Sequence, residues 1–254
     1  MSAPRIGFVI GGVQKGGTTA LAQYLASDPR IALPKGKEAH VFDAPDYDDR
    51  WAPADIDARY AAHFEEAPDG ALCGDATPIY CFHPACVRRI AAYNPAMRWV
   101  LLLRHPVERA VSQYYMERSR GDEPWPFWPA MLLERWRLQG HQDDFSPGSP
   151  LRHFSYRARG DYARQLDVLF AHFPREQVLL LRNEALAARP GEVLEQVLAF
   201  LGMPGAIQEE ADYGRVFAGE YPPLLRNGIR FRLLQWLMRQ PMRRAREGYG
   251  LEWT

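Results

Sequence analysis

Short apolar runs alternate with amphipathic segments along most of the chain. The runs at 6–10, 31–33, 99–103 and 178–181 are typical of strands buried on both faces of a sheet. The segments between them repeat apolar positions three and four residues apart, which is the helical period. This alternation predicts an α/β fold, a three-layer parallel sheet with flanking helices. Helices are expected at 18–26, 59–64, 86–93, 106–115, 162–173 and 192–201.

Three other segments lack this alternation. Residues 43–57 are rich in aspartate and are expected to form a surface loop. Residues 121–150 are rich in tryptophan, proline and glycine, and predict a helix-bearing insertion over one face. Residues 222–254 form a basic and apolar C-terminal segment. Because no internal repeat or linker divides the chain, we expect a single domain over 1–254.

The composition excludes several classes of protein. Of the 254 residues, 47% are hydrophobic and 24% are charged, which excludes a disordered chain. Positive and negative side chains balance at 31 each, so no net field favours nucleic acid as a partner. The three cysteines have neither the number of a disulfide framework nor the spacing of a zinc site. No apolar run approaches the roughly 20 residues that span a bilayer, and we see no secretory signal, so a cytoplasmic protein is expected.

The cations are distributed unevenly. Among the 31 lysines and arginines only three are lysine, namely Lys15, Lys35 and Lys37. A codon bias toward arginine explains this count as well as a function does, so both explanations stay open. The position of Lys15 is more informative, because it lies in a glycine-rich loop.

That loop, GGVQKGGTT, connects the first strand to the first helix. Gly16 and Gly17 allow backbone N–H groups to converge on an anion at the helix N-terminus. Lys15 adds a mobile charge, and the hydroxyl groups of Thr18 and Thr19 can donate to phosphate oxygens. The pattern predicts a P-loop-like, phosphate-binding turn; a tight turn that merely contains glycines is the alternative.

Two details separate this turn from that of a nucleotide kinase. In P-loop enzymes the lysine directly precedes a serine or threonine that ligates magnesium, and an aspartate at the end of a buried strand positions the metal. Here two glycines follow Lys15, and the corresponding strand leads into Arg104. We therefore expect the loop to neutralise phosphate with protein cations and without a metal.

A second anion site is predicted where the most apolar strand ends. Arg104 follows that strand, at the edge of the sheet where ligands of open α/β sheets gather. Ser112 lies in the next helix, which Pro106 is expected to open. Arg104 and Ser112 can therefore hold one phosphate together, unless the arginine only pairs with an acid of the helix.

Titratable side chains gather in the segment KEAHVFD, which follows the second strand. Glu38 has Lys37 and His40 as neighbours and is a candidate general base. A solvated loop charge is the alternative explanation and, on the pattern alone, the more frequent one.

The order and spacing of these three segments resemble the sulfotransferases that use 3′-phosphoadenosine 5′-phosphosulfate (PAPS). The resemblance is closest to the heparan-sulfate type and its bacterial relatives, and it covers about residues 5–201. GVQKGGTTAL at 12–21 is similar to the family's 5′-phosphosulfate loop, and 103–114 is similar to its 3′-phosphate motif. Residues 37–43 are similar to the segment that supplies the catalytic glutamate of glycan O-sulfotransferases.

The resemblance implies metal-independent, in-line transfer of the sulfuryl group from PAPS to a hydroxyl or amine of a glycan or small-molecule acceptor, with release of 3′,5′-bisphosphoadenosine. It implies that Glu38 is the base, that Lys15 stabilises the leaving group and that His40 orients Glu38 or the acceptor. The residues implied to bind PAPS are Lys15, Gly16, Gly17, Thr18, Thr19, Arg104 and Ser112. The 121–150 insertion is then expected to lie over the active site.

The chain departs from the family pattern at one segment. Glycan sulfotransferases have Glu-Lys-(Ser/Thr)-Pro where this chain has DATP at 75–78, so Ala76 replaces a lysine that assists the chemistry. Two other readings of the chain therefore stay open: a metal-dependent, kinase-like phosphotransferase and a non-catalytic nucleotide-binding adaptor.

Residues 226–246 contain seven arginines and no acid, interleaved with apolar residues at helical spacing until Pro241, which is expected to interrupt the helix. The pattern predicts a terminal helix packed on its own domain or a peripheral contact with an anionic membrane. RNG at 226–228 is also similar to a phosphate contact of cytosolic sulfotransferases. The sequence specifies neither the acceptor nor the oligomeric state.

Overall fold

The computed structural model describes residues 4–64, 70–205, 226 and 228–253. The chain divides into two compact units, residues 1–103 with 168–217 (unit 1) and residues 104–167 with 218–254 (unit 2). The expectation of a single domain over 1–254 stays a prediction. Residues 222–225 of the C-terminal segment and Asn227 of its RNG motif lie outside the described residues.

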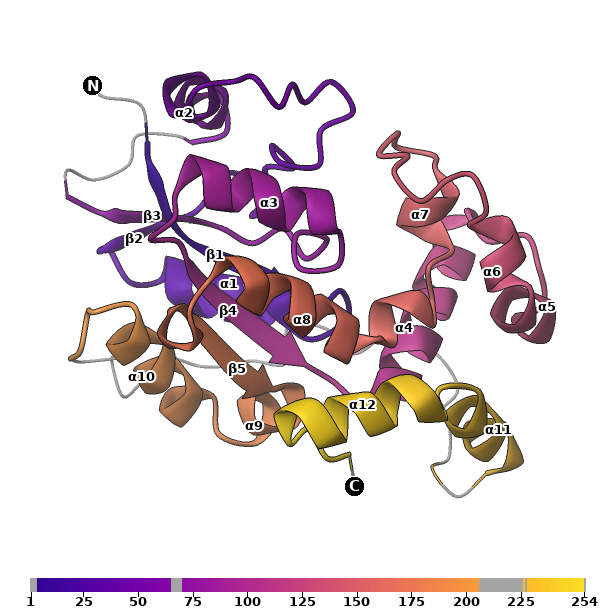
Figure 1. The fold of residues 1–254 in the computed structure, drawn as a ribbon. Helices are drawn as coiled ribbons and strands as arrows, with labels where there is room; N and C mark the ends of the chain where they lie inside the picture. Colours follow the sequence, from indigo (N-terminus) through magenta and orange to yellow (C-terminus); the bar gives the residue numbers. More distant parts are fainter. Residues whose placement is uncertain (1–3, 65–69, 206–225, 227, 254) are drawn as a thin grey trace. The chain divides into compact units, whose positions relative to one another are not determined.

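Unit 1 contains a five-stranded parallel sheet with the strand order β2-β3-β1-β4-β5 (Figure 1). The strands are β1 Ile6–Gly12, β2 Ile31–Ala32, β3 Leu72–Asp75, β4 Arg98–Leu103 and β5 Val178–Arg182. The helices of unit 1 are α1 Thr18–Ala26, α2 Pro53–Ala61, α3 Pro84–Tyr93, α9 Asn183–Ala188 and α10 Pro190–Phe200, and α8 Tyr162–His172 runs from residues of unit 2 into residues of unit 1.

Helices cover both faces of this sheet, as the alternation of patterns predicted. On one face, Phe8 and Val100 share a core with apolar residues of α1, α9 and α10. Side chains alternate along a strand, so Trp99 points to the opposite face, where its ring centroid lies 5.5 Å from that of Phe173. Helix α3 also covers this opposite face (Figure 1). The parallel three-layer α/β fold is therefore confirmed.

Two elements of unit 1 differ from the expectation. Strand β3 was not expected; it has four residues, and a Cβ at its Gly74 would lie 2.2 Å from the ring of Phe8. Helix α2 begins within the segment 43–57, so the prediction of a loop was wrong from residue 53 onward. Pro53 occupies the first turn, where its missing N–H costs nothing, and the Asp55 carboxylate accepts the N–H of residue 52 at 2.8 Å.

The described part of unit 2 is helical. Its elements are α4 Pro106–Arg120, α5 Phe127–Leu132, α6 Glu134–Arg137, α7 Pro150–His153, a 3-10 turn at Ala158–Gly160, α11 Ile229–Leu237 and α12 Arg239–Tyr249. Pro106 opens α4 as predicted, and the expected insertion carries α5, α6 and the first residue of α7. Residues of α4, α5 and α11 share one apolar core that includes Tyr114 and Leu234.

The C-terminal helices break at a different residue from the one expected. The interruption lies at Met238, between α11 and α12, whereas Pro241 lies in the first turn of α12. A first-turn proline needs no intrahelical N–H partner, so Pro241 is compatible with the helix that it was expected to interrupt. Among the described helices none is both long enough and apolar enough to cross a bilayer.

Candidate active site

The turn after β1 requires glycine at two positions. A Cβ at residue 16 would lie 2.3 Å from the carbonyl oxygen of Leu102, and the N–H of Gly16 donates to Val13 at 2.8 Å. Gly17 has a φ of 101°, and a Cβ there would lie 2.7 Å from Nδ2 of Asn183. That Nδ2 atom donates to the carbonyl oxygen of Gly16 at 2.8 Å, so Asn183 ties the turn to the residue that follows β5.

Helix α1 begins directly after this turn at Thr18, the residue that the sequence predicted as its first. No side chain caps the helix, and its first turn contains no acidic residue. The positive end of its dipole is therefore not neutralised by its own residues. Thr18 is buried and Thr19 is half-buried at this helix end, an arrangement that favours an anion.

Backbone strain is concentrated in two loops of unit 1, the glycine-rich turn after β1 and the KEAHVFD segment, where the sequence predicted functional residues. Among the described residues other than glycine, positive φ occurs at Lys15 (67°), Lys37 (68°) and His40 (54°). A side chain with a Cβ rarely adopts this left-handed conformation. Such residues persist where the surrounding structure holds them, and they cluster at functional sites.

Glu38 lies at the centre of a charged cluster in the second of these loops. One carboxylate oxygen of Glu38 pairs with Nζ of Lys37, and the other lies 3.2 Å from Nε2 of His40. The Nδ1 atom of His40 lies 2.9 Å from the carboxylate of Asp43, which is fully buried. The Glu38 side chain itself remains 30% exposed, so an acceptor can approach it.

These contacts set the charge states of the cluster. Burial alone lowers the pKa of His40, but its hydrogen bonds to Asp43 and Glu38 outweigh burial and raise the pKa to about 9. Burial alone raises the pKa of Glu38, but the hydrogen bond from His40 and the charge of Lys37 outweigh it and lower the pKa below its ordinary value of 4.5. At neutral pH the cluster therefore contains an ionised Glu38 beside a protonated His40.

The end of β3 fixes the backbone of this loop. Asp75 is fully buried, and its Oδ1 accepts the hydroxyl of Thr77 at 2.7 Å and the N–H of Ala39 at 3.3 Å. Its Oδ2 accepts the hydroxyl groups of Tyr60 at 2.8 Å and Tyr80 at 2.7 Å. Burial raises the pKa of Asp75, and these hydrogen bonds oppose that shift.

Two of the same side chains also contact the loop directly. The hydroxyl oxygen of Tyr80 accepts the N–H of Val41 at 3.1 Å, and Thr77 accepts the N–H of His40 at 3.4 Å. Sequence reasoning missed this support and the contact of Asn183, because both depend on tertiary neighbours. Asp75 and Thr77 belong to the DATP segment, which departs from the family pattern at Ala76, and Ala76 is fully buried in the apolar core.

In unit 2, Arg104 precedes α4 and Ser112 lies buried within that helix. Nε of Arg104 lies 3.6 Å from Oε2 of Glu108, and Nε of Arg226 donates to Oε1 of the same carboxylate at 2.7 Å. Arg104 therefore does pair with an acid of its helix, which was the alternative to phosphate binding. The carboxylate also brings two guanidinium groups to one place, and the second belongs to the RNG motif.

One group of potential metal ligands occurs among the described residues. Glu117, Asp122 and His153 place ligand atoms within 4.8 Å of one another. His153 Nδ1 lies 2.8 Å from the Glu117 carboxylate, and its Nε2 lies 2.7 Å from the carbonyl oxygen of Pro147. The sequence did not indicate this group, and none of its members is a predicted site residue. The expectation of metal-free chemistry stays a prediction.

The fold and the site define a class: a parallel α/β protein with a glycine-rich turn between its first strand and first helix. Residues 7–208 match the Sulfotransferase family, and the chain belongs to it. The resemblance stated from the motifs is thereby confirmed.

Individual relatives agree with this assignment. The chain is 29% identical over 205 residues to human heparan sulfate glucosamine 3-O-sulfotransferase 3B1, an alignment that covers 81% of this chain and 48% of the relative. The chain thus spans about half the length of the curated relatives it matches. A crystal structure of a sulfotransferase from Alicyclobacillus acidocaldarius is 27% identical, with a TM-score of 0.74 over 98% of this chain and 97% of that one. A sulfotransferase domain from the Synechococcus PCC 7002 olefin synthase shares the fold, with a TM-score of 0.51, 17% identity and coverage of 81% and 76%.

Proposed function

We propose that the protein transfers the sulfuryl group of PAPS to a hydroxyl or amine of a glycan or small-molecule acceptor, without a metal, and releases 3′,5′-bisphosphoadenosine. The observation that carries this proposal is the strain at Lys15, Lys37 and His40. Strained residues mark the two loops that sulfuryl transfer needs, one to hold the phosphosulfate and one to supply the base. Membership of the family supports PAPS as the donor.

The donor is held through its two phosphate groups. The 5′-phosphosulfate binds the turn of unit 1 through Lys15, Gly16, Gly17, Thr18 and Thr19, where the uncapped end of α1 supplies N–H groups and a positive dipole. The 3′-phosphate binds Arg104 and Ser112 of unit 2. Glu108 pairs with the guanidinium groups of Arg104 and Arg226 in this structure, so a 3′-phosphate bound there competes with this carboxylate for the two arginines.

In the chemical step the acceptor oxygen forms a bond to sulfur while the bond from sulfur to the bridging oxygen of the 5′-phosphate breaks. Glu38 takes the proton that the acceptor hydroxyl loses. Lys15 stabilises the negative charge that develops on the departing phosphate oxygen, and such positioned charges contribute most of the rate in related group transfers. The electron pair of the broken bond leaves with 3′,5′-bisphosphoadenosine.

His40 acts as a positioning residue. A histidine with a pKa of about 9 is protonated at neutral pH and donates hydrogen bonds, so it does not compete with Glu38 for the proton. Asp43 holds the other side of the ring. Lys37 supplies a positive charge at Glu38, whereas Ala76, in the place of the family lysine, supplies none.

We infer a glycan acceptor from two supports. The human relative is named for the 3-O-sulfation of heparan sulfate glucosamine. In unit 2, Trp136 is 66% exposed and stacks on Trp125 at an interplanar angle of 14°, which leaves an aromatic face of the kind that packs on a sugar ring. We propose that the insertion covers the active site.

The three free, buried cysteines agree with a reducing compartment, and we propose that the reaction takes place in the cytoplasm.

The test is a transfer assay in the presence of a metal chelator. The protein is incubated with PAPS and, in parallel, with heparan sulfate oligosaccharides and with small alcohols and amines. Release of 3′,5′-bisphosphoadenosine, matched by an acceptor that gains one sulfuryl group, supports the proposal. Phosphate transfer from ATP that requires magnesium supports a phosphotransferase instead. Tight binding of the bisphosphate without turnover of any acceptor supports an adaptor.

A further inference from the structure

Helix α11 has an apolar face that unit 2 does not bury. Phe231 and Leu234 pack into the core, with exposed fractions of 4% and 0%. At 3.6 residues per turn a second set of positions, spaced four and three apart, falls on the opposite side of the helix. These positions, called the α11 stripe below, are Ile229 (83% exposed), Leu233 (43%) and Trp236 (56%).

Arginines border this stripe. On the helix, Arg230 and Arg232 lie on opposite sides of it, and both side chains are exposed. Residues 226–246 contain no acid that would neutralise them. A helix with an apolar stripe between basic borders lies flat in a lipid headgroup layer, with its apolar side chains directed at the acyl boundary and its cations at the phosphates.

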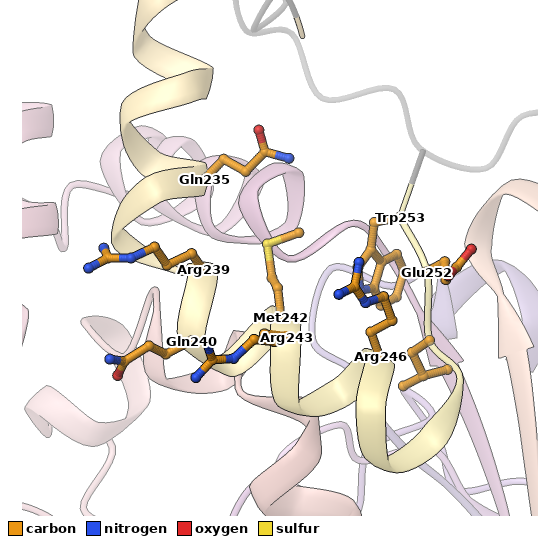
Figure 2. A pocket seen from close by; sticks show the side chains of 9 residues that line it. Gln235, Arg239, Gln240, Met242, Arg243, Arg246, Glu252 and Trp253 are labelled. Carbon is orange, nitrogen blue, oxygen red and sulfur yellow. The ribbon is translucent and has the colours of Figure 1, made fainter.

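A cavity of about 800 Å³ lies beside α12 (Figure 2). Helix α12 contributes Arg239, Arg243 and Arg246 to its lining, against the single carboxylate of Glu252, and Trp253 contributes an apolar wall. Arg239 connects the cavity to the α11 stripe, because its guanidinium lies 4.2 Å from the ring centroid of Trp236. The cavity is therefore cationic on one side and apolar on another, which suits an amphiphile with an anionic head.

We propose that this face of unit 2 docks on an anionic phospholipid surface. The α11 stripe enters the headgroup layer, and Arg239, Arg243 and Arg246 bind lipid phosphates at the cavity. The charge pattern favours a phospholipid surface over a second copy of the chain and over a small soluble anion. A second copy of the chain would bring two basic surfaces together, and a small soluble anion would fill the cavity while leaving the α11 stripe in water. The inference does not depend on the proposed sulfuryl transfer.

The experiment is co-sedimentation of the full chain with vesicles of phosphatidylcholine alone and of equimolar phosphatidylcholine and phosphatidylglycerol. We expect binding to the anionic vesicles only. The double substitution Leu233→Gln with Trp236→Gln should weaken this binding about tenfold or more, because it removes the inserted apolar groups. Arg243→Gln with Arg246→Gln should weaken it about 25-fold, since each basic residue near such a surface contributes about fivefold.

Each double variant has a matched control. Leu132→Gln with Trp136→Gln changes two equally exposed apolar residues outside the stripe, and Arg88→Gln with Arg135→Gln removes the same charge elsewhere. Both controls should bind the anionic vesicles like the wild type. Equal binding to neutral vesicles, equal losses in the controls, or no vesicle binding at all would overturn the proposal. So would a concentration-dependent dimer that Leu233→Gln abolishes, because a second copy would then occupy the stripe.

Discussion

The Nε2 atom of His40 lies 3.2 Å from a carboxylate oxygen of Glu38, while the opposite ring nitrogen faces the buried carboxylate of Asp43. A ring with a carboxylate at both nitrogens is most stable as the doubly protonated imidazolium, which has two N–H donors. The relationship gives the two residues different roles. In the proposed mechanism Glu38 gains the proton, and His40 holds Glu38 in place.

Glu38→Gln should lower kcat by about 10²- to 10⁴-fold, the usual contribution of a general base. The affinity for 3′,5′-bisphosphoadenosine should be unchanged, because glutamine keeps the shape and still accepts hydrogen bonds from His40. Steady-state kinetics together with a binding titration measure both quantities. Glu192→Gln, which alters an exposed carboxylate of α10, is the control. Full activity of the Glu38→Gln variant would remove Glu38 from the mechanism.

The imidazolium of His40 predicts a dependence on alkaline pH. The pKa of His40 in the folded protein, about 9, is above its ordinary value of 6.5, so its pairing stabilises the fold fully below 6.5 and is lost as the pH rises through about 9. The Tm difference between the wild type and His40→Asn should therefore shrink across this window. Asparagine tolerates the left-handed backbone at this position. An unchanged difference across the window would mean that His40 is not the titrating group.

The protonation of His40 also predicts that kcat/KM falls at alkaline pH, as a descending limb of the pH profile. We expect kcat/KM of the wild type to fall near pH 9, as His40 loses the proton with which it donates a hydrogen bond to Glu38. The His40→Asn variant should be slower and should lack this limb. A limb at the same pH in the variant would assign it to another group.

Lys15→Ala should lower kcat by about 10²-fold or more, the scale of losing one donor that stabilises transition-state charge. Lys35→Ala is the matched control, because Lys35 is exposed and lies outside the turn. Lys15→Arg is the sharper variant. The charge that develops on the leaving oxygen requires a compact ammonium, whereas a planar guanidinium suits a fixed oxyanion. If Lys15→Arg keeps full activity, the lysine at this position reflects composition only.

The network around Asp75 offers a test of positioning. Tyr80→Phe removes a hydroxyl that donates to Asp75 and also accepts the N–H of Val41 in the loop at 37–43, which carries Glu38. It should lower the free energy of unfolding by about 1–3 kcal/mol and lower kcat as well. Tyr60→Phe removes a hydroxyl that donates to the same carboxylate, but keeps the ring that packs on Phe42 of that loop, so it should lower stability and spare kcat. Equal effects of the two variants on kcat would leave the network with a structural role only.

Local sequence patterns predicted much of the fold. Helix α1 begins and ends where the sequence predicted, and Pro106 opens α4, because helix-forming composition and proline geometry act within a few residues. Strand β3 was missed because four residues carry little periodicity, and its Gly74 is required by the ring of Phe8 on another strand. Contacts of this kind are not visible in a local pattern.

The candidate site, like the fold, was predicted only in part. Residue types and spacing singled out Lys15, Glu38 and Arg104, because anion binding and base chemistry draw on few side chains. The residues that hold the loops, such as Asp75 and Asn183, act through partners far away in the sequence. The protonation of His40 likewise follows from its hydrogen bonds to Asp43 and Glu38, whose geometry only the fold determines.

The most direct test of the central claim is a calorimetric titration of the wild-type chain with 3′,5′-bisphosphoadenosine in the presence of a chelator, compared with a titration with magnesium and ATP. We expect the bisphosphate to bind without metal and more tightly than ATP with magnesium. Lys15→Ala and Arg104→Ala should each weaken this binding by about tenfold or more, the scale of a lost charge-assisted hydrogen bond. A strict preference for magnesium and ATP, with no binding of the bisphosphate, would contradict the proposed sulfuryl transfer from PAPS.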